Sequence, residues 1–338
     1  MRIGVVGVGR MGLRHIQVAR NLGWSIVGVT DSNAAAIQNA AEQFALGKNQ
    51  LFASLDAMLR AAHPDALAIA TTAPSHAPLV LQGAACGVGY ILCEKPMGVS
   101  IEQCESMIEE CTTRGVKLAV NHQMRFMEQY TSIKERIDAP ELGGLQSIVV
   151  LGSNFGLAMN GTHYFEMFRF MTDHDVGTVS AWLDDDDVPN PRGSEFKDRG
   201  GQVRCVNALG QTLILDCRTS VGHGVQVAYS CRNGQITVDE LSGKVRTIHR
   251  KGEFLSLPTT RYAMPAEEVL TTIAPADVVA PTEAVWRAMV GGQTFPDGYA
   301  GLHAVRCAAA AHASHELGGM GVNLNSAAID VRRVFPWA

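Results

Sequence analysis

The sequence is poor in charged residues, which make up 18% of its 338 residues and leave a formal net charge of −5. Lys and Arg form no basic stripe, so we expect no binding to nucleic acid. No run of about 18 apolar residues exists, and the apolar start Met1–Gly7 is too short for an export signal. We therefore expect a cytoplasmic protein with no membrane partner.

Spacings typical of metal ligands are also missing. The eight cysteines form no Cys-x-x-Cys and have no pair of histidines nearby at zinc spacing, so we interpret them as reduced thiols. The acidic run Asp184–Asp187 could hold a cation, but a solvated loop is the preferred interpretation, and we expect no metal site. Hydrophobic residues make up 46%, which is enough for packed cores, and the length suggests two domains.

Short apolar runs alternate with helical patterns through residues 1–121. The predicted strands are Arg2–Val6, Ser25–Asp31, Ala66–Ala70, Gly89–Cys93 and Lys117–Asn121. The predicted helices are Met11–Leu22, Asn33–Phe44, Leu55–Ala62, His76–Ala85 and Ile101–Arg114. Such alternation predicts an α/β Rossmann domain with a parallel sheet covered on both faces.

The pattern changes from about Leu145, where strands follow one another without helices between them. The predicted strands are Gln146–Leu151, Gly201–Val206, Thr212–Cys217, Gly224–Cys231 and Gln235–Asp239. This predicts an α+β domain with an antiparallel sheet over residues 122–338. A helix is predicted at Leu302–Leu317, where Gly318 and Gly319 end it, and we expect that the C-terminal helix can pack back on the first domain.

A dinucleotide fingerprint, G-x-G-x-x-G, directly follows the first predicted strand. Its residues are Gly7, Val8, Gly9, Arg10, Met11 and Gly12. Gly7 permits the tight turn, Gly9 lets the backbone approach a pyrophosphate, and Gly12 lets helix and strand pack closely. The N-terminus of the following helix would then bind the phosphates.

The second strand is predicted to end at Asp31, nineteen residues after Gly12, where a carboxylate can accept hydrogen bonds from the adenosine ribose. Asp31 would repel the 2′-phosphate of NADP, and the next residues, Ser32 and Asn33, carry no positive charge. The sequence therefore favours NAD, although Arg10 could reach a phosphate. The alternative role for Asp31 is that of a helix N-cap.

Three further motifs follow the third, fourth and fifth predicted strands in turn. They are Thr71-Thr72-Ala73-Pro74-Ser75-His76, Glu94-Lys95-Pro96 and Gln123-Met124-Arg125-Phe126. Together with the glycine turn, this set resembles the glucose–fructose oxidoreductase / inositol dehydrogenase / MocA (Gfo/Idh/MocA) family. The resemblance covers nearly the whole chain, but its specific motifs lie within the first ~170 residues, and the acidic residue Asp31 resembles the NAD-using inositol dehydrogenases.

The resemblance implies a Rossmann domain followed by a domain with a large, mostly antiparallel open sheet, which binds substrate and assembles into homodimers or homotetramers. It also implies which residues meet the cofactor. Near the nicotinamide end these are Thr71, Thr72, Pro74 and His76, with Glu94 and Lys95 beside the nicotinamide ribose and the substrate.

The position and chemistry of Lys95 also predict a role at the substrate, apart from the resemblance. It follows a strand of a doubly wound sheet at its carboxyl end, where such sheets bind their ligands. Its ammonium can donate hydrogen bonds to a substrate hydroxyl and stabilise negative charge that develops on that oxygen. Pro96 disfavours a helical conformation at Lys95 and so restricts the direction of the side chain. The alternative is an ordinary exposed lysine.

The family usually carries Asp-x-G-x-His at the start of a helix, with the His as general base. Here the segment is Met159-Asn160-Gly161-Thr162-His163, so Met159 replaces the Asp, and Glu166 stands where an Asp often follows. A helix N-terminus disfavours the imidazolium and keeps His163 able to accept a proton. The alternative is that His163 caps or packs the helix.

The leading hypothesis is hydride transfer between NAD and a hydroxyl-bearing carbon, with Lys95 polarising the oxygen and His163 moving the proton. The expected substrate is a sugar, amino sugar, inositol or nucleotide-linked sugar. The candidate substrate-binding residues are Gln123, Arg125, Asn160 and Glu166. Two alternatives stay open: a non-catalytic NAD-binding sensor or scaffold, and a lyase or glycosidase that uses bound NAD transiently.

Overall fold

The computed structural model describes residues 1–185, 190–222, 224–256, 265–274 and 277–338. The chain forms two compact units. The first consists of Met1–Phe126, Asp277–Val305 and Val331–Ala338, and the second of Met127–Ala276 and Arg306–Asp330. The first unit therefore runs past residue 121 and takes up two segments from the end of the chain.

The first unit contains a six-stranded parallel sheet in the order β3-β2-β1-β4-β5-β6. Its strands are β1 (Arg2–Val6), β2 (Ser25–Thr30), β3 (Leu51–Phe52), β4 (Ala66–Ile69), β5 (Tyr90–Cys93) and β6 (Lys117–Val120). Four residues of β4 are all buried, as expected for a strand covered on both faces. The reversal of strand order between β1 and β4 brings the loops after these strands to the edge of the sheet where dinucleotides bind.

Helices cover this sheet, and serine and asparagine side chains begin several of them. The helices are α1 (Arg10–Asn21), α2 (Ala34–Gln43), α3 (Leu55–Ala62), α4 (His76–Ala85), α5 (Ile101–Thr113) and α8 (Val279–Gly291). The Ser100 side chain accepts a hydrogen bond from the Gln103 backbone N–H and so caps α5. The five strands and five helices predicted for this region are confirmed, each to within one residue at either end.

The sequence patterns predicted neither the two-residue strand β3 nor helix α8. Helix α8 is the larger of these two segments. It packs on α1, and its Trp286 is fully buried in the same apolar core as Ile16 and Val29. The rings of Trp286 and Trp24 meet edge to face at 5.2 Å. Burial of a large aromatic side chain explains why a segment so late in the sequence belongs to the first unit.

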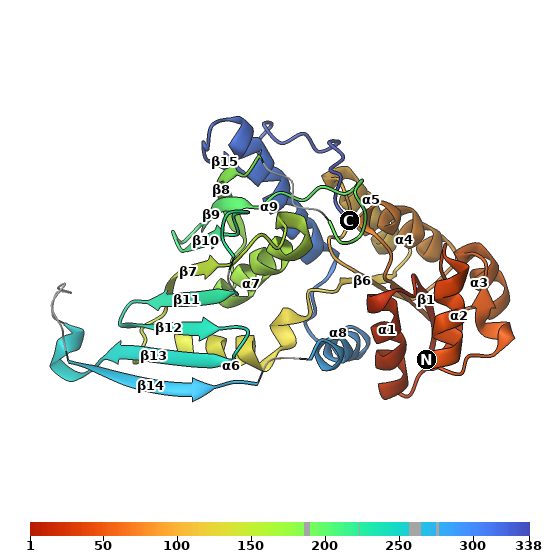
Figure 1. Cartoon of the computed structure of the whole chain (residues 1–338), viewed down its shortest axis with the longest axis horizontal. Coiled ribbons are helices and arrows are strands. Elements are labelled where there is room, and N and C mark those ends of the chain that lie inside the picture. Colours follow the sequence, from red (N-terminus) through yellow and green to blue (C-terminus); the bar gives the residue numbers. More distant parts are fainter. Residues whose placement is uncertain (186–189, 223, 257–264, 275–276) are drawn as a thin grey trace. The chain divides into compact units, whose positions relative to one another are not determined.

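The second unit contains a nine-stranded sheet in the order β14-β13-β12-β11-β7-β10-β9-β8-β15 (Figure 1). Its strands are β7 (Leu145–Leu151), β8 (Val176–Leu183), β9 (Gly201–Asn207), β10 (Thr212–Asp216), β11 (Gln226–Cys231), β12 (Gly234–Asp239), β13 (Lys244–Arg250), β14 (Ala266–Thr272) and β15 (Val322–Asn323). Among the strands of this sheet that the structure describes, only β7 and β10 pair in parallel. The predicted, mostly antiparallel sheet is therefore confirmed, although β8, β13, β14 and β15 were not anticipated.

One face of the second sheet is buried and the other is partly open. Alternate residues of β9 are buried, and α7 (Thr162–Thr172) contacts β7 and β10. Two further long helices are α6 (Glu128–Ile137) and α9 (Gly298–Glu316). The helix predicted near the end at Leu302–Leu317 corresponds to α9, which begins four residues earlier and ends one residue earlier. Among the described residues, no helix is both long and apolar enough to span a membrane.

Candidate functional site

The turn between β1 and α1 has the geometry that the glycine fingerprint predicts. Gly7 has a φ of +81°, and its N–H donates to the Thr30 carbonyl at 2.8 Å. A Cβ atom on Gly12 would lie 1.9 Å from the Gly7 carbonyl oxygen, so helix and turn leave no room for a side chain. A Cβ on Gly9 would meet nothing within 4 Å, which leaves the first turn of α1 open to a ligand.

Asp31 faces this turn from the end of β2. Its Oδ2 accepts the Val8 backbone N–H at 2.7 Å, and its Oδ1 accepts the Asn33 N–H at 2.8 Å. The N-cap of α2 is Asn33, whose side chain accepts the Ala35 N–H. The alternative role of Asp31 as that helix cap is therefore wrong, and its carboxylate instead joins β2 to the glycine turn.

The motif after β4 is tied to the motif after β5 through a histidine. The His76 ring is buried, with Nδ1 2.9 Å from the Pro96 carbonyl oxygen and Nε2 3.1 Å from that of Thr71. The Ser75 hydroxyl donates to Thr71 Oγ1 at 2.7 Å. The His76 ring thus connects the turn that begins at Thr71 with Pro96. The Lys95–Pro96 peptide is cis.

Glu94 lies at the centre of a buried polar cluster that the sequence patterns did not reveal. Its Oε1 accepts hydrogen bonds from His15 Nε2 at 2.9 Å and Asn121 Nδ2 at 2.8 Å. Burial by itself raises the pKa of Glu94. The hydrogen bond and charge of His15, the Asn121 amide and the charge of Lys95 outweigh it and lower the pKa to about 2. The Glu94 side chain is therefore an anion at neutral pH.

Some buried polar atoms of this cluster and of the nearby residue Gln123 form no hydrogen bond. Within the described part of the chain, His15 Nδ1, Asn121 Oδ1 and Gln123 Oε1 are buried without a hydrogen-bond partner. Such groups are costly unless another molecule or water satisfies them. They stand on α1 and just after β6, so they border the same sheet edge as the glycine turn.

All the candidate residues of the first unit thus meet along one edge of its sheet. Lys95 is half-buried and follows β5, and Arg125 is half-buried in the short helix Gln123–Phe126 that follows β6. The parallel strands all end at this edge, which is why motifs spread over 120 residues come together there. His15 belongs to the same edge, but a lone histidine on a helix gives no signal in the sequence.

The candidate residues of the second unit gather at the start of α7. His163 lies in the first turn of this helix and is 8% exposed. A π-helical turn, Leu157–Gly161, runs directly into it. The Asn160 side-chain amide donates to the Phe155 carbonyl at 2.9 Å. This amide N–H group therefore bonds within the loop that carries Asn160.

Glu166 and an aspartate from a distant segment complete this group. Glu166 is 2% exposed and forms an ion pair with Arg169 at 3.5 Å, while Arg169 also donates to Asp175 at 2.5 Å. The Asp198 carboxylate accepts the backbone N–H groups of Ala158 and Met159. Asp198 was not anticipated, because it lies 39 residues from Met159 and in no recognisable motif.

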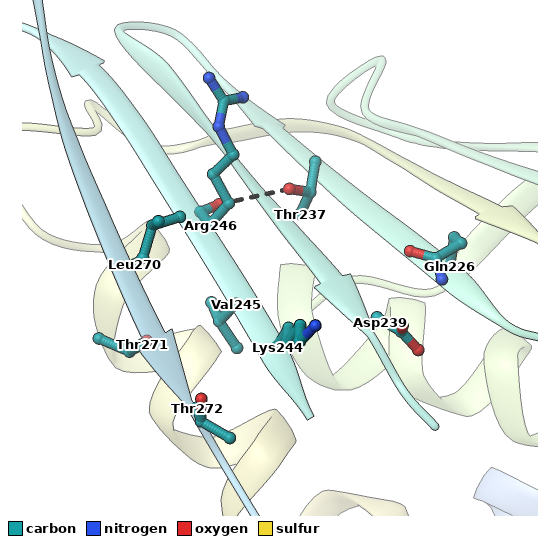
Figure 2. Close-up of a pocket in the computed structure, with 9 residues that line it drawn as sticks. All are labelled: Gln226, Thr237, Asp239, Lys244, Val245, Arg246, Leu270, Thr271 and Thr272. Atoms are coloured by element: carbon teal, nitrogen blue, oxygen red, sulfur yellow. Dashed lines mark hydrogen bonds between the residues drawn. The ribbon is translucent and has the colours of Figure 1, made fainter. Parts of the chain in front are cut away.

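Two hollows of the described surface lie away from the candidate residues. One, of about 680 Å³, is lined by residues of β11, β12, β13 and β14, where Arg246, Thr237 and Leu270 form part of its wall (Figure 2). Another lies at the opposite end of the first sheet, around Met1 and Tyr90. Neither contains a candidate residue. Among the described residues no group of His, Cys, Asp or Glu could hold a metal ion, and Asp186 and Asp187 of the acidic run lie outside them.

Comparisons with known proteins agree with this arrangement. A family model described as an oxidoreductase family with an NAD-binding Rossmann fold, GFO_IDH_MocA, matches residues 1–122. An inositol 2-dehydrogenase of Pseudomonas syringae pv. syringae (strain B728a) is 28% identical over 194 residues, which cover 56% of this chain and 56% of that protein. A D-apiose dehydrogenase of Paraburkholderia graminis is 33% identical over 123 residues, covering 36% of this chain and 32% of that protein. The chain thus spans about half or less of the length of these relatives.

A solved structure extends the likeness to both units. UDP-N-acetylglucosamine 3-dehydrogenase GnnA from Acidithiobacillus ferrooxidans is 20% identical to the chain, with a TM-score of 0.75. The match covers 94% of this chain and 98% of that one. At this level of identity the likeness shows a shared fold.

Proposed function

Because residues 1–122 match the model of the GFO_IDH_MocA oxidoreductase family, we propose that the chain is an NAD-dependent dehydrogenase or reductase acting on a sugar-like substrate. The observation that carries the proposal is the sheet edge where the open glycine turn, Asp31 and the Glu94–Lys95 pair lie together. A bound dinucleotide supplies the hydride donor or acceptor. The chain's own residues bind it, orient the substrate and move the proton.

The residues present fit a dinucleotide. The open first turn of α1 offers backbone N–H groups and a helix N-terminus to a pyrophosphate, and no side chain on Gly9 blocks the approach. Asp31 is fixed by two backbone N–H groups with lone pairs left to accept ribose hydroxyls. The same carboxylate disfavours a 2′-phosphate, which supports NAD rather than NADP.

Two side chains are assigned to the chemistry of the substrate hydroxyl. Lys95 donates a hydrogen bond to this oxygen and stabilises its developing negative charge, and the ionised Glu94 beside it favours the ammonium form of Lys95. His163 takes or returns the proton as general base or acid. Its position in the first turn of α7 favours the neutral imidazole that this role needs.

The named relatives and the polar groups after β6 support the proposed substrate class. Inositol and D-apiose, named for two relatives, are polyhydroxylated compounds. The buried Gln123 Oε1 is an acceptor for a substrate hydroxyl, and Arg125 is a donor for an oxygen or a carboxylate. Asn160 and Glu166 act with them as substrate-binding residues in this proposal.

The test is a panel of inositols, aldoses, amino sugars and nucleotide sugars, incubated with purified protein and NAD or NADH. Formation or loss of NADH is followed by absorbance. The proposal expects net turnover of the nicotinamide with at least one member. NAD binding with no chemical change in any substrate would support a sensor instead, and substrate cleavage without net NADH would support transient oxidation.

A further inference from the structure

The loop that leads into α7 is tied to one distant segment by several hydrogen bonds. The backbone N–H groups of Ala158 and Met159 donate to the two oxygens of Asp198, at 2.9 and 2.7 Å. The Leu157 N–H donates to the Arg199 carbonyl at 3.0 Å. Three consecutive N–H groups of one turn are therefore held by two consecutive residues, and a carboxylate is a stronger acceptor than a neutral carbonyl.

The contact between this turn and Asp198 is so close that it restricts which residue can occupy position 156. Gly156, just before this turn, has a φ of +76°, and a Cβ atom there would lie 2.1 Å from Asp198 Oδ2. Its N–H is held by the Asn154 side chain at 2.9 Å. A residue with a side chain at position 156 would have to displace Asp198, so glycine here serves the approach of the carboxylate.

The turn held by Asp198 is continuous with the helix that carries His163. The Gly161 N–H donates to the Gly156 carbonyl, and the Thr162 hydroxyl donates to the Ala158 carbonyl at 2.8 Å. His163 is four residues after Met159 and so lies on the same face one turn later. A shift of residues 157–161 would therefore also change the orientation of the His163 imidazole.

The remainder of α7 has separate supports. Phe165 and Phe168 are fully buried, and the Tyr164 hydroxyl donates to Glu240 at 2.8 Å. These contacts fix the body of the helix on the sheet. The hydrogen bonds of residues 157–159 hold the turn that leads into this helix, and a carboxylate at that N-terminal end also offsets the helix dipole.

We propose that Asp198 is a positioning residue for His163: by accepting the N–H groups of Ala158 and Met159, it fixes the first turn of α7 and with it the imidazole. Met159 cannot supply a carboxylate, and Asp198 brings one to the backbone of that position from another segment. The effect on turnover rests on the proposed dehydrogenase function, whereas the effect on His163 does not.

The first test therefore uses the protein without substrate. D198A and D198N are compared with wild type in two assays followed by mass spectrometry: hydrogen exchange of peptides covering residues 155–163, and the rate at which diethyl pyrocarbonate modifies His163. The matched control is D239N, because Asp239 also accepts two backbone N–H groups, from Leu241 and Ser242, in a turn of the second sheet. Thermal unfolding confirms that each variant is folded, and D198N replaces D198A where the latter does not fold.

We expect faster exchange over residues 155–163 and a modification rate at His163 changed by roughly threefold or more in both Asp198 variants. The rate at the exposed His174 is the internal reference and stays constant. The D239N protein behaves as wild type at His163. Unchanged reactivity of His163 in folded D198A or D198N overturns the proposal, whether or not the protein proves to be a dehydrogenase.

The second test uses the substrate identified in the panel. D198A should lower kcat by about tenfold or more with KM altered by less than about threefold, since a misplaced proton-transfer group costs turnover more than binding. D198N should fall between D198A and wild type, and NAD affinity should be unchanged. A D198A enzyme with wild-type kcat contradicts the positioning role. A wild-type protein that turns over no substrate refutes the proposed function, and the modification rate of His163 then decides the role of Asp198.

Discussion

His15 Nε2 lies 2.9 Å from Glu94 Oε1, and both side chains are almost completely buried. The pair joins the first helix of the chain to the residue directly before Lys95. Because a buried carboxylate is stable as an anion only when hydrogen bonds and charges compensate its burial, His15 and Asn121 maintain the charge beside Lys95.

The first prediction concerns this pair and pH. A carboxyl whose pKa is lowered by folding stabilises the protein above its unfolded pKa of about 4.5, and the stabilisation is lost as pH falls toward about 2. H15Q raises the pKa of Glu94, so it should flatten the fall in stability between pH 5 and 2. The lost contribution is at most about 3 kcal/mol at neutral pH, and urea unfolding at several pH values measures it.

An exposed histidine provides the control for that experiment. H174Q removes a histidine at the surface of the second unit and should leave the pH dependence unchanged. Parallel stability curves for H15Q and wild type between pH 5 and 2 would contradict the assigned role of His15.

The second prediction concerns the choice of cofactor. D31S removes a charged acceptor, and hydrogen bonds to charged groups contribute about 1.5–3 kcal/mol, so NAD should bind roughly tenfold or more weakly. NADP binding should weaken less or improve, because the negative charge is gone. Calorimetric titration measures both. D65N is the control, since Asp65 also accepts a backbone N–H, that of Arg2, but at the opposite edge of the sheet. Tighter binding of NADP than NAD by wild type would contradict the prediction.

The third prediction separates two glycines of the same turn. G12A places a Cβ against the Gly7 carbonyl oxygen and should cost about 1–3 kcal/mol of folding stability as well as NAD binding. G9A meets no protein atom and should keep the wild-type melting temperature while it weakens NAD binding by obstructing the pyrophosphate. Thermal unfolding and NAD titration distinguish the two. Wild-type NAD affinity in G9A would contradict the binding of the pyrophosphate above Gly9, and equal loss of stability in both variants would contradict the open space there.

The fourth prediction concerns catalysis. K95A and H163A should each lower turnover on the identified substrate by about 10²-fold or more, as expected for loss of a charge-stabilising or proton-transfer group. NAD affinity should change little in H163A. Steady-state kinetics with parallel NAD titration measure both effects. Wild-type turnover by H163A would exclude a role for this residue in proton transfer.

The fifth prediction concerns assembly. The open face of the second sheet exposes Trp182, Leu151 and Ile214, and we propose that it is buried in a homodimer or homotetramer. I214D should then shift the protein toward a 36.2 kDa monomer in sedimentation velocity runs. L209D changes an exposed leucine in the turn between β9 and β10 and serves as the control. A wild-type protein that sediments only as a monomer at micromolar concentration contradicts the proposal.

The sequence predicted best what is decided locally. The ends of β1 and α5 follow from short apolar runs, the glycine turn and the Ser100 cap, all of which act within a few residues. The edge where Asp31, Thr71 and Lys95 meet also follows, because parallel strands align their ends in a predictable way.

The sequence did not predict contacts between segments far apart in the chain. The partners of His15 and Met159 lie 79 and 39 residues away, and no periodicity or motif connects such positions. Helix α8 was missed for the same reason, since its place depends on where Trp286 is buried rather than on its own pattern. Strand β14 carries many polar residues and lacks the alternation that marks a half-buried strand. Strand β13 alternates exposed and buried residues only over Lys244–Thr247, where Val245 is the single apolar residue.

The late return of α8 has a consequence for how the protein is made. Trp286 and Met289 belong to the core that also holds Ile3 and Val29, so residues 1–126 alone would leave that core uncovered. During synthesis, the ribosome has to deliver the whole of Met127–Ala276 before the first unit can close. The apolar surface of residues 1–126 therefore stays exposed until residues 279–291 have been synthesised, although this segment emerges first from the ribosome.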